Sequence, residues 1–473
     1  MRLGLVCMCH RGGKSETIGF RAVGVDTGGC GQGLRLLRFA RNDNRGGVMG
    51  RGLIWVVVAL LLARPPAWAE WPQFRGPLGN GHAAPESTGL PLRWSETENV
   101  RWKVAIPHRG WSTPVAMGGQ VWLTTATAEG GDYFVICLDA ETGQIVLNKQ
   151  LFHSDAPEPL GNNINCYASP SPAVEAGRVY VHFGSYGTAC LDTRTFEVLW
   201  ERTDLPCRHY RGPGSSVIVF EGLLIVTMDG VDVQYLAALD KKTGKTVWKT
   251  DRTTEWNDLD KDGKPFDNGD LRKAYSTPLI IDVGGATQMI SVGARSAYGY
   301  DPRDGREIWK VRYPGFSNAA CPVYGNGVVY ILTGFGRTEL YAVAADGRGD
   351  VTDTHIRWTA KQTLPQIPSP LLVGDLLYTV SDAGMVVCFD AATGEEVWQE
   401  RLKGKHAASP VYADGRVYWF DQDGNGTVFR PGRQYEHLAT NRLDEGCMAS
   451  PAVSGGALFV RTKSHLYRIE SSQ

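Results

Sequence analysis

The sequence has no excess of charge of either sign. Its 49 lysine and arginine residues are matched by 50 aspartate and glutamate residues, which gives a formal net charge of −1. A protein that binds nucleic acid through the phosphates normally carries a basic face and has a high isoelectric point. The balanced charge argues against nucleic acid as a partner.

The sequence also lacks an apolar run of membrane-spanning length around its clearest hydrophobic segment. That segment, LIWVVVALLL, covers only residues 53–62, whereas a spanning helix needs about 20 residues. Arg51 precedes it, and Ala67-Trp68-Ala69 follows as a small-x-small cleavage pattern. We expect a signal peptide over residues 49–69, cut after Ala69, and a periplasmic or secreted mature chain without a transmembrane span. A short anchor that stays attached is the alternative.

Residues 1–48 lie upstream of this signal peptide, are rich in arginine and glycine, and show little apolar periodicity. We interpret them as a doubtful N-terminal extension produced by a start codon assigned too early. The segment contains Cys7-Met8-Cys9-His10, which is one residue short of the C-x-x-C-H haem attachment spacing. No cysteine stands directly after the cleavage site, so a lipoprotein anchor is not supported either.

Seven cysteines remain beyond residue 69, and an odd number in an oxidising compartment leaves at least one unpaired. The chain therefore has no disulfide framework. Three of these cysteines, Cys137, Cys190 and Cys388, fall in a repeated motif where a small residue is required, which indicates a packing role. Cys166 and Cys207 lie in adjacent connections, either as a disulfide or as two free thiols.

The motif itself reads ALDKKTGKTVW at residues 238–248 and recurs at 299–309 and 388–398, with weaker copies at 137–147 and 190–200. The aspartate and the Thr-Gly pair predict a tight hairpin turn, because Asp bonds nearby backbone and Gly adopts positive φ. In one weaker copy Phe196 replaces the glycine. The terminal tryptophan is expected to pack over the small residue and to join one repeat to the next. The predicted docking residues are Trp102, Trp200, Trp248, Trp309, Trp358 and Trp398.

A second motif, a small residue followed by proline and a Gly-containing hairpin, precedes the first. Its proline slots fall at 114, 172, 217 (a valine), 278, 322, 370, 410 and 451, spaced 40 to 61 residues apart. Eight repeats of about 40 to 50 residues with four strands each are typical of a β-propeller. We predict an all-β fold: a single eight-bladed propeller of four-stranded antiparallel blades over residues 100–473, preceded by an N-terminal segment at 70–99.

Closure of the ring can also be predicted. The last repeat, from Ser450, has only three strand-like runs and lacks the strand that ends in tryptophan. The sequence around Trp102 matches that missing strand. We expect the N-terminal strand to complete the last blade, which removes two exposed sheet edges.

The two motifs closely resemble those of the PQQ-like, or quinoprotein-type, propeller family over residues 100–470. The opening WPQFRGP at residues 71–77 is similar to that of exported members. The resemblance implies the fold and two alternatives for function. BamB, the outer-membrane assembly lipoprotein, is a non-enzymatic scaffold, whereas quinoprotein dehydrogenases of alcohols or sugars use PQQ and Ca²⁺. This chain has no Cys-Cys dipeptide like that beside PQQ in the alcohol dehydrogenases, and no lipoprotein cysteine like that of BamB.

In a propeller, the connections from each outer strand to the next inner strand open on one face around the central channel. These connections contain basic and aromatic residues suited to an anionic, planar or sugar-like ligand. The candidates are His108, Arg109, Trp111, Asn162, Asn163, Asn165, Tyr167, His209, Tyr210, Arg211, Arg272, Lys273, Tyr275, Phe316, Asn318, Gln366, Lys405, His406, Asp444 and Glu445. A solvated polar funnel is the alternative, and no catalytic set can be assigned.

Asp258, Asp260 and Asp262 form a D-x-D-x-D-G run that resembles a calcium loop, although Gly269 occupies the position of the final Glu. Either a weak Ca²⁺ site or an acidic surface hairpin fits this pattern. Our leading hypothesis is an exported non-enzymatic scaffold that binds an envelope protein or a small polar or anionic ligand. A PQQ-dependent dehydrogenase is the alternative, and carbohydrate binding is a third.

Overall fold

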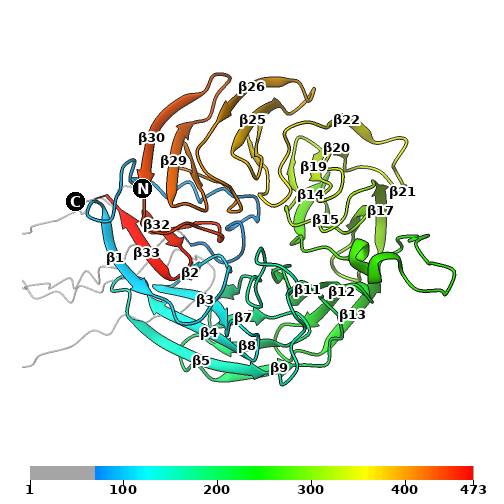
Figure 1. Cartoon of the computed structure of the whole chain (residues 1–473), viewed down its shortest axis with the longest axis horizontal. Coiled ribbons are helices and arrows are strands. Elements are labelled where there is room, and N and C mark those ends of the chain that lie inside the picture. The colour runs from blue at the N-terminus through cyan, green and yellow to red at the C-terminus, as the bar shows by residue number, and fades with distance from the viewer. Residues whose placement is uncertain (1–69, 472–473) are drawn as a thin grey trace, which may run out of the picture. The chain divides into compact units, whose positions relative to one another are not determined.

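The computed structural model describes residues 70–471, and in this part of the chain 33 strands form eight antiparallel blades arranged in a ring (Figure 1). The predicted all-β, eight-bladed propeller is confirmed. The predicted extension at 1–48 and the signal peptide at 49–69 lie outside the described residues and stay predictions. No helix in the described part is long and apolar enough to cross a membrane.

The first four blades carry the following strands. Blade 1 consists of β2 (Val115–Met117), β3 (Gln120–Ala126), β4 (Asp132–Asp139) and β5 (Ile145–His153). Blade 2 consists of β6 (Ala173–Glu175), β7 (Arg178–His182), β8 (Thr188–Asp192) and β9 (Val198–Arg202). Blade 3 consists of β10 (Ile218–Phe220), β11 (Leu223–Asp229), β12 (Gln234–Asp240) and β13 (Thr246–Asp251). Blade 4 consists of β14 (Leu279–Val283), β15 (Ala286–Val292), β16 (Ser296–Tyr300), β17 (Glu307–Arg312) and the added β21 (Gly349–Asp350).

The other four blades follow the same order. Blade 5 consists of β18 (Val323–Gly325), β19 (Val328–Leu332), β20 (Leu340–Ala344) and β22 (Ile356–Ala360). Blade 6 consists of β23 (Leu371–Val373), β24 (Leu376–Val380), β25 (Met385–Asp390) and β26 (Glu396–Arg401). Blade 7 consists of β27 (Val411–Ala413), β28 (Arg416–Phe420), β29 (Asn425–Arg430) and β30 (Glu436–Arg442). Blade 8 consists of β31 (Ala452–Ser454), β32 (Ala457–Arg461), β33 (His465–Glu470) and β1 (Val100–Ala105). A short 3₁₀ segment, η1 (Phe266–Arg272), lies between blades 3 and 4.

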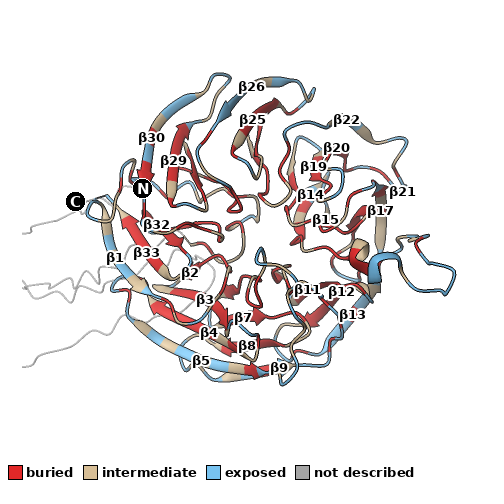
Figure 2. Cartoon of the chain, viewed as in Figure 1, coloured by how far each residue is buried: buried red, intermediate tan, exposed pale blue. Residues whose placement is uncertain are grey.

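Each of the eight predicted proline slots immediately precedes an inner strand. Pro114 precedes β2, and Val217, the single exception in residue type, precedes β10. The missing N–H of proline is tolerated at the first position of a strand, where no ladder bond is lost. Figure 2 shows the consequence for packing: residues of the inner and middle strands are largely buried, whereas the outer strands β5, β13 and β26 carry many exposed residues.

Five of the six predicted docking tryptophans donate the indole N–H to a backbone carbonyl in the turn of the next blade. In four of these turns a glycine also lies under the indole: Gly143, Gly244, Gly305 and Gly394. A Cβ at Gly244, for example, would come within 2.7 Å of the Trp200 ring. The small residue of the motif faces the tryptophan of its own blade, as Ala238 does for Trp248. The bonds are Trp102 to Ala140 O, Trp200 to Lys241 O, Trp248 to Pro302 O and Trp358 to Ala391 O, each at 3.1 Å, and Trp398 to Gly432 O at 2.9 Å.

Two blade contacts lack a tryptophan, since Leu147 and Ala439 stand at its position in blades 1 and 7. The contact between blades 1 and 2 shows a compensating exchange of sizes. The outer strand of blade 1 has Leu147 in the tryptophan position, and the following turn has Phe196 in the glycine position, with φ of 61°. Both side chains pack against the same cluster of buried residues. A smaller residue on one blade therefore leaves room for a larger one on the next.

Trp309 is the exception among the docking residues. It donates to the side-chain oxygen of Gln288 in its own blade, at 2.9 Å. The cause is local: β21, inserted after the third strand of blade 5, pairs in parallel with β17 beside Trp309 and gives blade 4 a fifth strand. The motif predicted four strands in every blade, and it contains no sign of this insertion.

The N-terminal strand β1 pairs with β33, in the order β1-β33-β32-β31, which confirms the predicted closure around Trp102. Two buried arginines of the last blade strengthen the junction with blade 1. Arg461 donates to the Ser112 hydroxyl at 2.6 Å and to the Thr124 carbonyl at 3.1 Å. Arg468 donates to the Ala140 carbonyl at 2.8 Å, which also accepts from Trp102.

Before β1, residues 71–83 cross one end of the central channel, and we call this segment the N-terminal plug. Trp71 exchanges two backbone hydrogen bonds of 2.9 Å with Ala116 of blade 1. Arg75, only 2% exposed, donates to the carbonyls of Pro370 at 2.6 Å and Pro410 at 2.9 Å. The plug thereby ties blade 1 to blades 6 and 7 across the ring.

Candidate functional site

A belt of small polar side chains surrounds the central channel directly before the proline slots. In six of the eight belt positions, the backbone N–H of the belt residue donates to the side-chain hydroxyl of the belt residue in the next blade, at 2.9 Å. The bonds run from Thr113 to Ser171, Ser171 to Ser216, Ser216 to Thr277, Cys321 to Ser369, Ser369 to Ser409 and Ser409 to Ser450. Cys321 is the single thiol of this belt.

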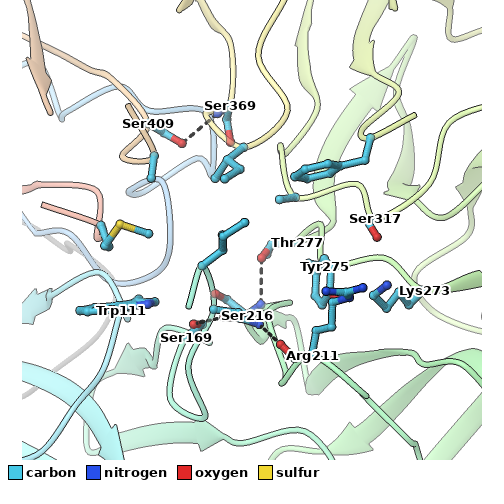
Figure 3. Close-up of a pocket in the computed structure, with 18 of the residues that line it drawn as sticks. Trp111, Ser169, Arg211, Ser216, Lys273, Tyr275, Thr277, Ser317, Ser369 and Ser409 are labelled. Atoms are coloured by element: carbon cyan, nitrogen blue, oxygen red, sulfur yellow. Dashed lines mark hydrogen bonds between the residues drawn. The ribbon is translucent and has the colours of Figure 1, made fainter. Parts of the chain in front are cut away.

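Above the belt lies a cavity of about 460 Å³, to which all eight inter-blade connections contribute residues. Its lining combines the belt hydroxyls with Trp111, Phe316 and Tyr275, and Phe74 of the plug also borders it. Figure 3 shows Arg211, Lys273 and Tyr275 together on one side of this cavity. A cavity of this size is typical of a site for a small molecule or for a few residues of a peptide.

The charged group of the cavity consists of two cations that share one carboxylate. Arg211 contacts the Asp270 carboxylate at 3.2 Å, and the Lys273 ammonium donates to the same carboxylate. The Lys273 side chain is 1% exposed, whereas that of Arg211 is 31% exposed. Burial lowers the pKa of Lys273, and the charge of Arg211 lowers it further.

The loop that carries Arg211 is held by Asn165, whose amide donates to the carbonyls of Arg211 at 2.9 Å and Pro213 at 3.0 Å. Asn165 was a sequence candidate for ligand binding, and the structure shows a positioning contact as well. Of the predicted residues, the following line the cavity: Trp111, Asn162, Asn165, Arg211, Lys273, Tyr275 and Phe316.

Three predicted residues of the first two inter-blade connections, His108, Arg109 and Tyr167, do not line the cavity. His108 stacks on Phe134 with ring centroids 4.2 Å apart. Arg109 lies over Trp111 at 5.0 Å and donates to the Asn163 carbonyl at 3.4 Å. Tyr167 is buried, and its hydroxyl donates to the Glu158 carbonyl.

His209 is buried and does not line the cavity, and its hydrogen bonds argue against a role as a base. Nε2 accepts from the Ser185 backbone N–H at 3.0 Å, which places the proton of the neutral ring on Nδ1. Nδ1 faces the Cys207 thiol at 3.6 Å. Burial lowers the pKa of His209 to about 4. The ring therefore serves as a neutral structural acceptor.

The remaining candidates lie away from the cavity. Arg272 pairs with Asp258 and lies over Trp256. Lys405 is exposed, and His406 is buried with Nε2 on the Lys403 carbonyl. Asp444 contacts Lys103 at 3.5 Å, and Glu445 accepts hydrogen bonds from Ser464 and Thr462. Asp444 and Glu445 line a separate polar pocket between the last blades.

The D-x-D-x-D-G run forms a surface hairpin. Asp258 pairs with the Arg272 guanidinium, and Asp260 accepts from the backbone N–H groups of Asp262 and Lys264. Across residues 70–471, no group of three or more acidic, histidine or cysteine side chains is arranged to hold a metal. The structure thus does not bring Asp258, Asp260 and Asp262 together as calcium ligands.

All seven cysteines of the described chain are free and buried, so Cys166 and Cys207 are two thiols and not a disulfide. Cys137, Cys190 and Cys388 are fully buried in the small-residue slots, as predicted. Burial raises the pKa of Cys207 well above that of an ordinary thiol. Such thiols are unreactive packing residues.

Three features of the site were missed from the sequence. Asp270 lies in the interruption of the repeat, where no motif fixes its neighbours. Phe74 reaches the cavity through the plug, whose path the sequence does not define. The hydroxyl belt had a usable signal, because Ser or Thr stands before seven of the eight slots.

The fold defines the chain as a closed propeller with a cavity at its central channel. A family profile described as outer membrane protein assembly factor BamB matches residues 94–271 and 349–433, more than half of the chain. The chain belongs to this family of PQQ-like, BamB-like propellers.

Three relatives show how far the similarity extends. BamB of Yersinia pestis is 25% identical over 209 residues, 40% of this chain and 48% of that protein, so the match spans about half of the curated relative. The crystal structure of BamB from Moraxella catarrhalis has a TM-score of 0.55 at 14% identity, covering 78% of this chain and 99% of that one. The quinohemoprotein alcohol dehydrogenase of Comamonas testosteroni has a TM-score of 0.61 at 13% identity, covering 86% and 81%. The two structural similarities establish the fold alone.

The quinoprotein resemblance implies PQQ with Ca²⁺, and the lining of the cavity tests this. Calcium takes six to eight oxygen ligands and favours carboxylates. Among the described residues that line the cavity, Asp270 provides the only carboxylate, and both Arg211 and Lys273 bind it. This donor set does not fit a calcium-assisted quinone site.

Proposed function

We propose that this chain is an exported, non-enzymatic binding module of the cell envelope, similar to BamB. It holds an anionic group, from a partner protein or from a small ligand, in the central cavity. The observation that carries this proposal is the juxtaposition of Arg211 and Lys273 above the hydroxyl belt. The export signal predicted at residues 49–69 and the family relationship support a periplasmic or secreted location.

The belt suits such a ligand for a geometric reason. Each belt hydroxyl that accepts a backbone N–H from the preceding blade keeps its own proton for another acceptor. Ser171, Ser216 and Ser409 all line the cavity and accept in this way. Several neutral O–H donors and the Arg211 guanidinium therefore converge on one space, which favours carboxylate or phosphate oxygens.

Lys273 couples ligand binding to protonation. Its pKa is lowered by burial, and a bound anion stabilises the charged form and raises that pKa. Binding is therefore accompanied by proton uptake, and the affinity for an anion decreases as the pH rises through the pKa of Lys273.

The test is isothermal calorimetry of the mature chain, residues 70–473, with citrate as a probe and Arg211→Gln as the variant. Loss of one charge-assisted contact is expected to raise the Kd by about tenfold. Arg430→Gln is the matched control, because Arg430 pairs with Glu436 on the exposed outer part of blade 7. Equal citrate binding by the wild type and Arg211→Gln, or no heat with the wild type, would contradict the proposal.

A PQQ-dependent dehydrogenase is the second candidate, suggested by the resemblance of the repeat motifs to those of quinoprotein propellers. Reconstitution with PQQ and Ca²⁺ separates the two candidates. Cofactor absorbance together with dye reduction by alcohols or aldoses would favour the dehydrogenase. Citrate binding without either signal supports the binding module.

A further inference from the structure

The plug binds the ring by pairing with the edges of inner strands. It uses the same position in each case, the second residue of the strand. Trp71 pairs with Ala116 of β2, and Gly81 and Ala83 pair with Tyr412 of β27, all at 2.9 Å. Val174 of β6 donates to the Pro72 carbonyl at 2.8 Å. The plug thus makes main-chain contacts with blades 1, 2 and 7 at this position. In blade 6 the same position is contacted by a side chain, because the His82 ring bonds the Leu372 carbonyl at 2.7 Å.

Blades 3, 4 and 5 present the same position without a partner. Val219, Ile280 and Tyr324 lie opposite Leu224, Met289 and Val329 in their hairpins. Antiparallel ladders alternate, and these are the pairs whose N–H and C=O groups point away from the neighbouring strand, as those of Ala116 do. Within residues 70–471, no protein group bonds the outward N–H or C=O of these three residues.

A cavity of about 410 Å³ lies at this unpaired edge. It is bordered by Val219, Ile280 and Tyr324 on the blades and by residues 77–80 of the plug. Leu78, which forms part of this border, is 69% exposed, the largest exposed fraction among the large apolar residues of the described chain. The cavity is lined by one basic and one acidic residue, Arg75 and Asp282, so its charges balance. Arg303 and Glu221, which do not line it, pair with each other at 2.9 Å.

We propose that this groove, bordered by Leu78, Val219, Ile280 and Tyr324, binds an extended, uncharged segment of a partner polypeptide. The segment continues the crossing path of the plug and exchanges main-chain hydrogen bonds with the inner strands of blades 3 to 5. Leu78 and the half-buried strand residues contact its apolar side chains. Exposed strand edges bind extended peptides in this way, with affinity from the main chain and specificity from the side-chain contacts. The groove is separate from the anion site, so either proposal can fail without the other.

The test uses the mature chain and a synthetic capped peptide of alternating valine and threonine. Amide hydrogen exchange is measured first: the amides of Ala116 and Tyr412 are expected to exchange slowly, and those of Val219, Ile280 and Tyr324 rapidly. Addition of the peptide at millimolar concentration is expected to slow exchange at these three amides. Slow exchange without peptide, or no slowing with it, would overturn the proposal.

Fluorescence anisotropy with a labelled form of the same peptide provides the second measurement. Leu78→Asp is expected to weaken binding by about tenfold, and N-methylation of alternate peptide amides is expected to abolish it. Val247→Asp is the control, because Val247 is 54% exposed on the outer strand of blade 3, away from the groove. Equal affinity of wild type and Leu78→Asp, or of the N-methylated peptide, would show that the groove does not bind a strand.

Discussion

Trp309 donates its indole N–H to the side-chain oxygen of Gln288 at 2.9 Å, and Gln288 donates its amide to the Ala345 carbonyl of the next blade at 3.1 Å. In the other docked blades the tryptophan reaches that carbonyl directly. Gln288 therefore replaces one direct contact by a relay of two hydrogen bonds. Both Trp309 and Gln288 are buried, so each group in the relay depends on the other for its partner.

Gln288→Leu is expected to lower the free energy of unfolding by about 1–3 kcal/mol, because it leaves a buried indole N–H and a buried carbonyl without partners. Urea denaturation monitored by tryptophan fluorescence measures this change. Gln120→Leu provides the control, since Gln120 also donates to the next blade, at Thr193, but is partly exposed. A loss for Gln288→Leu no larger than that of the control would contradict a buried relay.

Trp102→Ala is expected to destabilise the closing blade before the rest of the ring. The change removes the indole packed over the turn at Gly143 and the hydrogen bond to Ala140. Amide exchange in β33 should accelerate, while exchange in β16 of blade 4 stays at the wild-type rate. Trp256→Ala is the matched control, because the Trp256 ring contacts Arg272 in the connection between blades 3 and 4, away from the closing blade. Uniform acceleration in all blades would show that the junction is not a local weak point.

Acid is expected to destabilise the fold through two buried histidines. Burial lowers the pKa of His209 to about 4 and that of His182 to about 3, and the charge of His209 adds to the shift of His182. Above pH 6.5 both histidines are neutral in the folded and unfolded chain. As the pH falls from about 6.5 toward about 4, the unfolded chain takes up protons that the folded chain does not, so the free energy of unfolding decreases.

Urea denaturation between pH 7.5 and pH 5 measures this effect above the range in which carboxylates titrate, about pH 4. The double variant His182→Asn, His209→Gln keeps polar acceptors but cannot titrate, and its free energy of unfolding should depend much less on pH. The same pH dependence in both proteins would contradict the assignment.

The sequence predicted the repeat because its motif is set by contacts within one or two blades. The Asp and Thr-Gly positions define a turn, and the Pro slots mark where each inner strand begins. The relay at Gln288 and the strand β21 escaped prediction, since both depend on an insertion whose path no local rule determines. Leu147 and Phe196 were visible in the sequence as two departures from the repeat motif. Only the structure shows that the smaller side chain of one compensates for the larger side chain of the other.

The site was predicted in part for a related reason. Because propeller topology determines which connections open on one face, the position of Arg211 and Lys273 in inter-blade connections predicted the face on which they line the cavity. The direction of each side chain within a connection depends on its packing. His209 is buried beside Cys207, and Arg272 pairs with Asp258. Neither lines the cavity, although Arg211 and Lys273 stand only two residues and one residue further along the chain. The part played by Phe74 depends on a segment that precedes the first blade.

The plug sets an order of events for folding. Arg75 is made early in synthesis, but its carbonyl partners on Pro370 and Pro410 lie 295 and 335 residues later in the chain. Arg461 and Ser112 are 349 residues apart. Neither end of the molecule can reach its final contacts until nearly the whole polypeptide has been synthesised, and such long-range contacts form slowly. Until then the inner edges of the early blades stay available to other chains, so this architecture favours assistance by chaperones during folding.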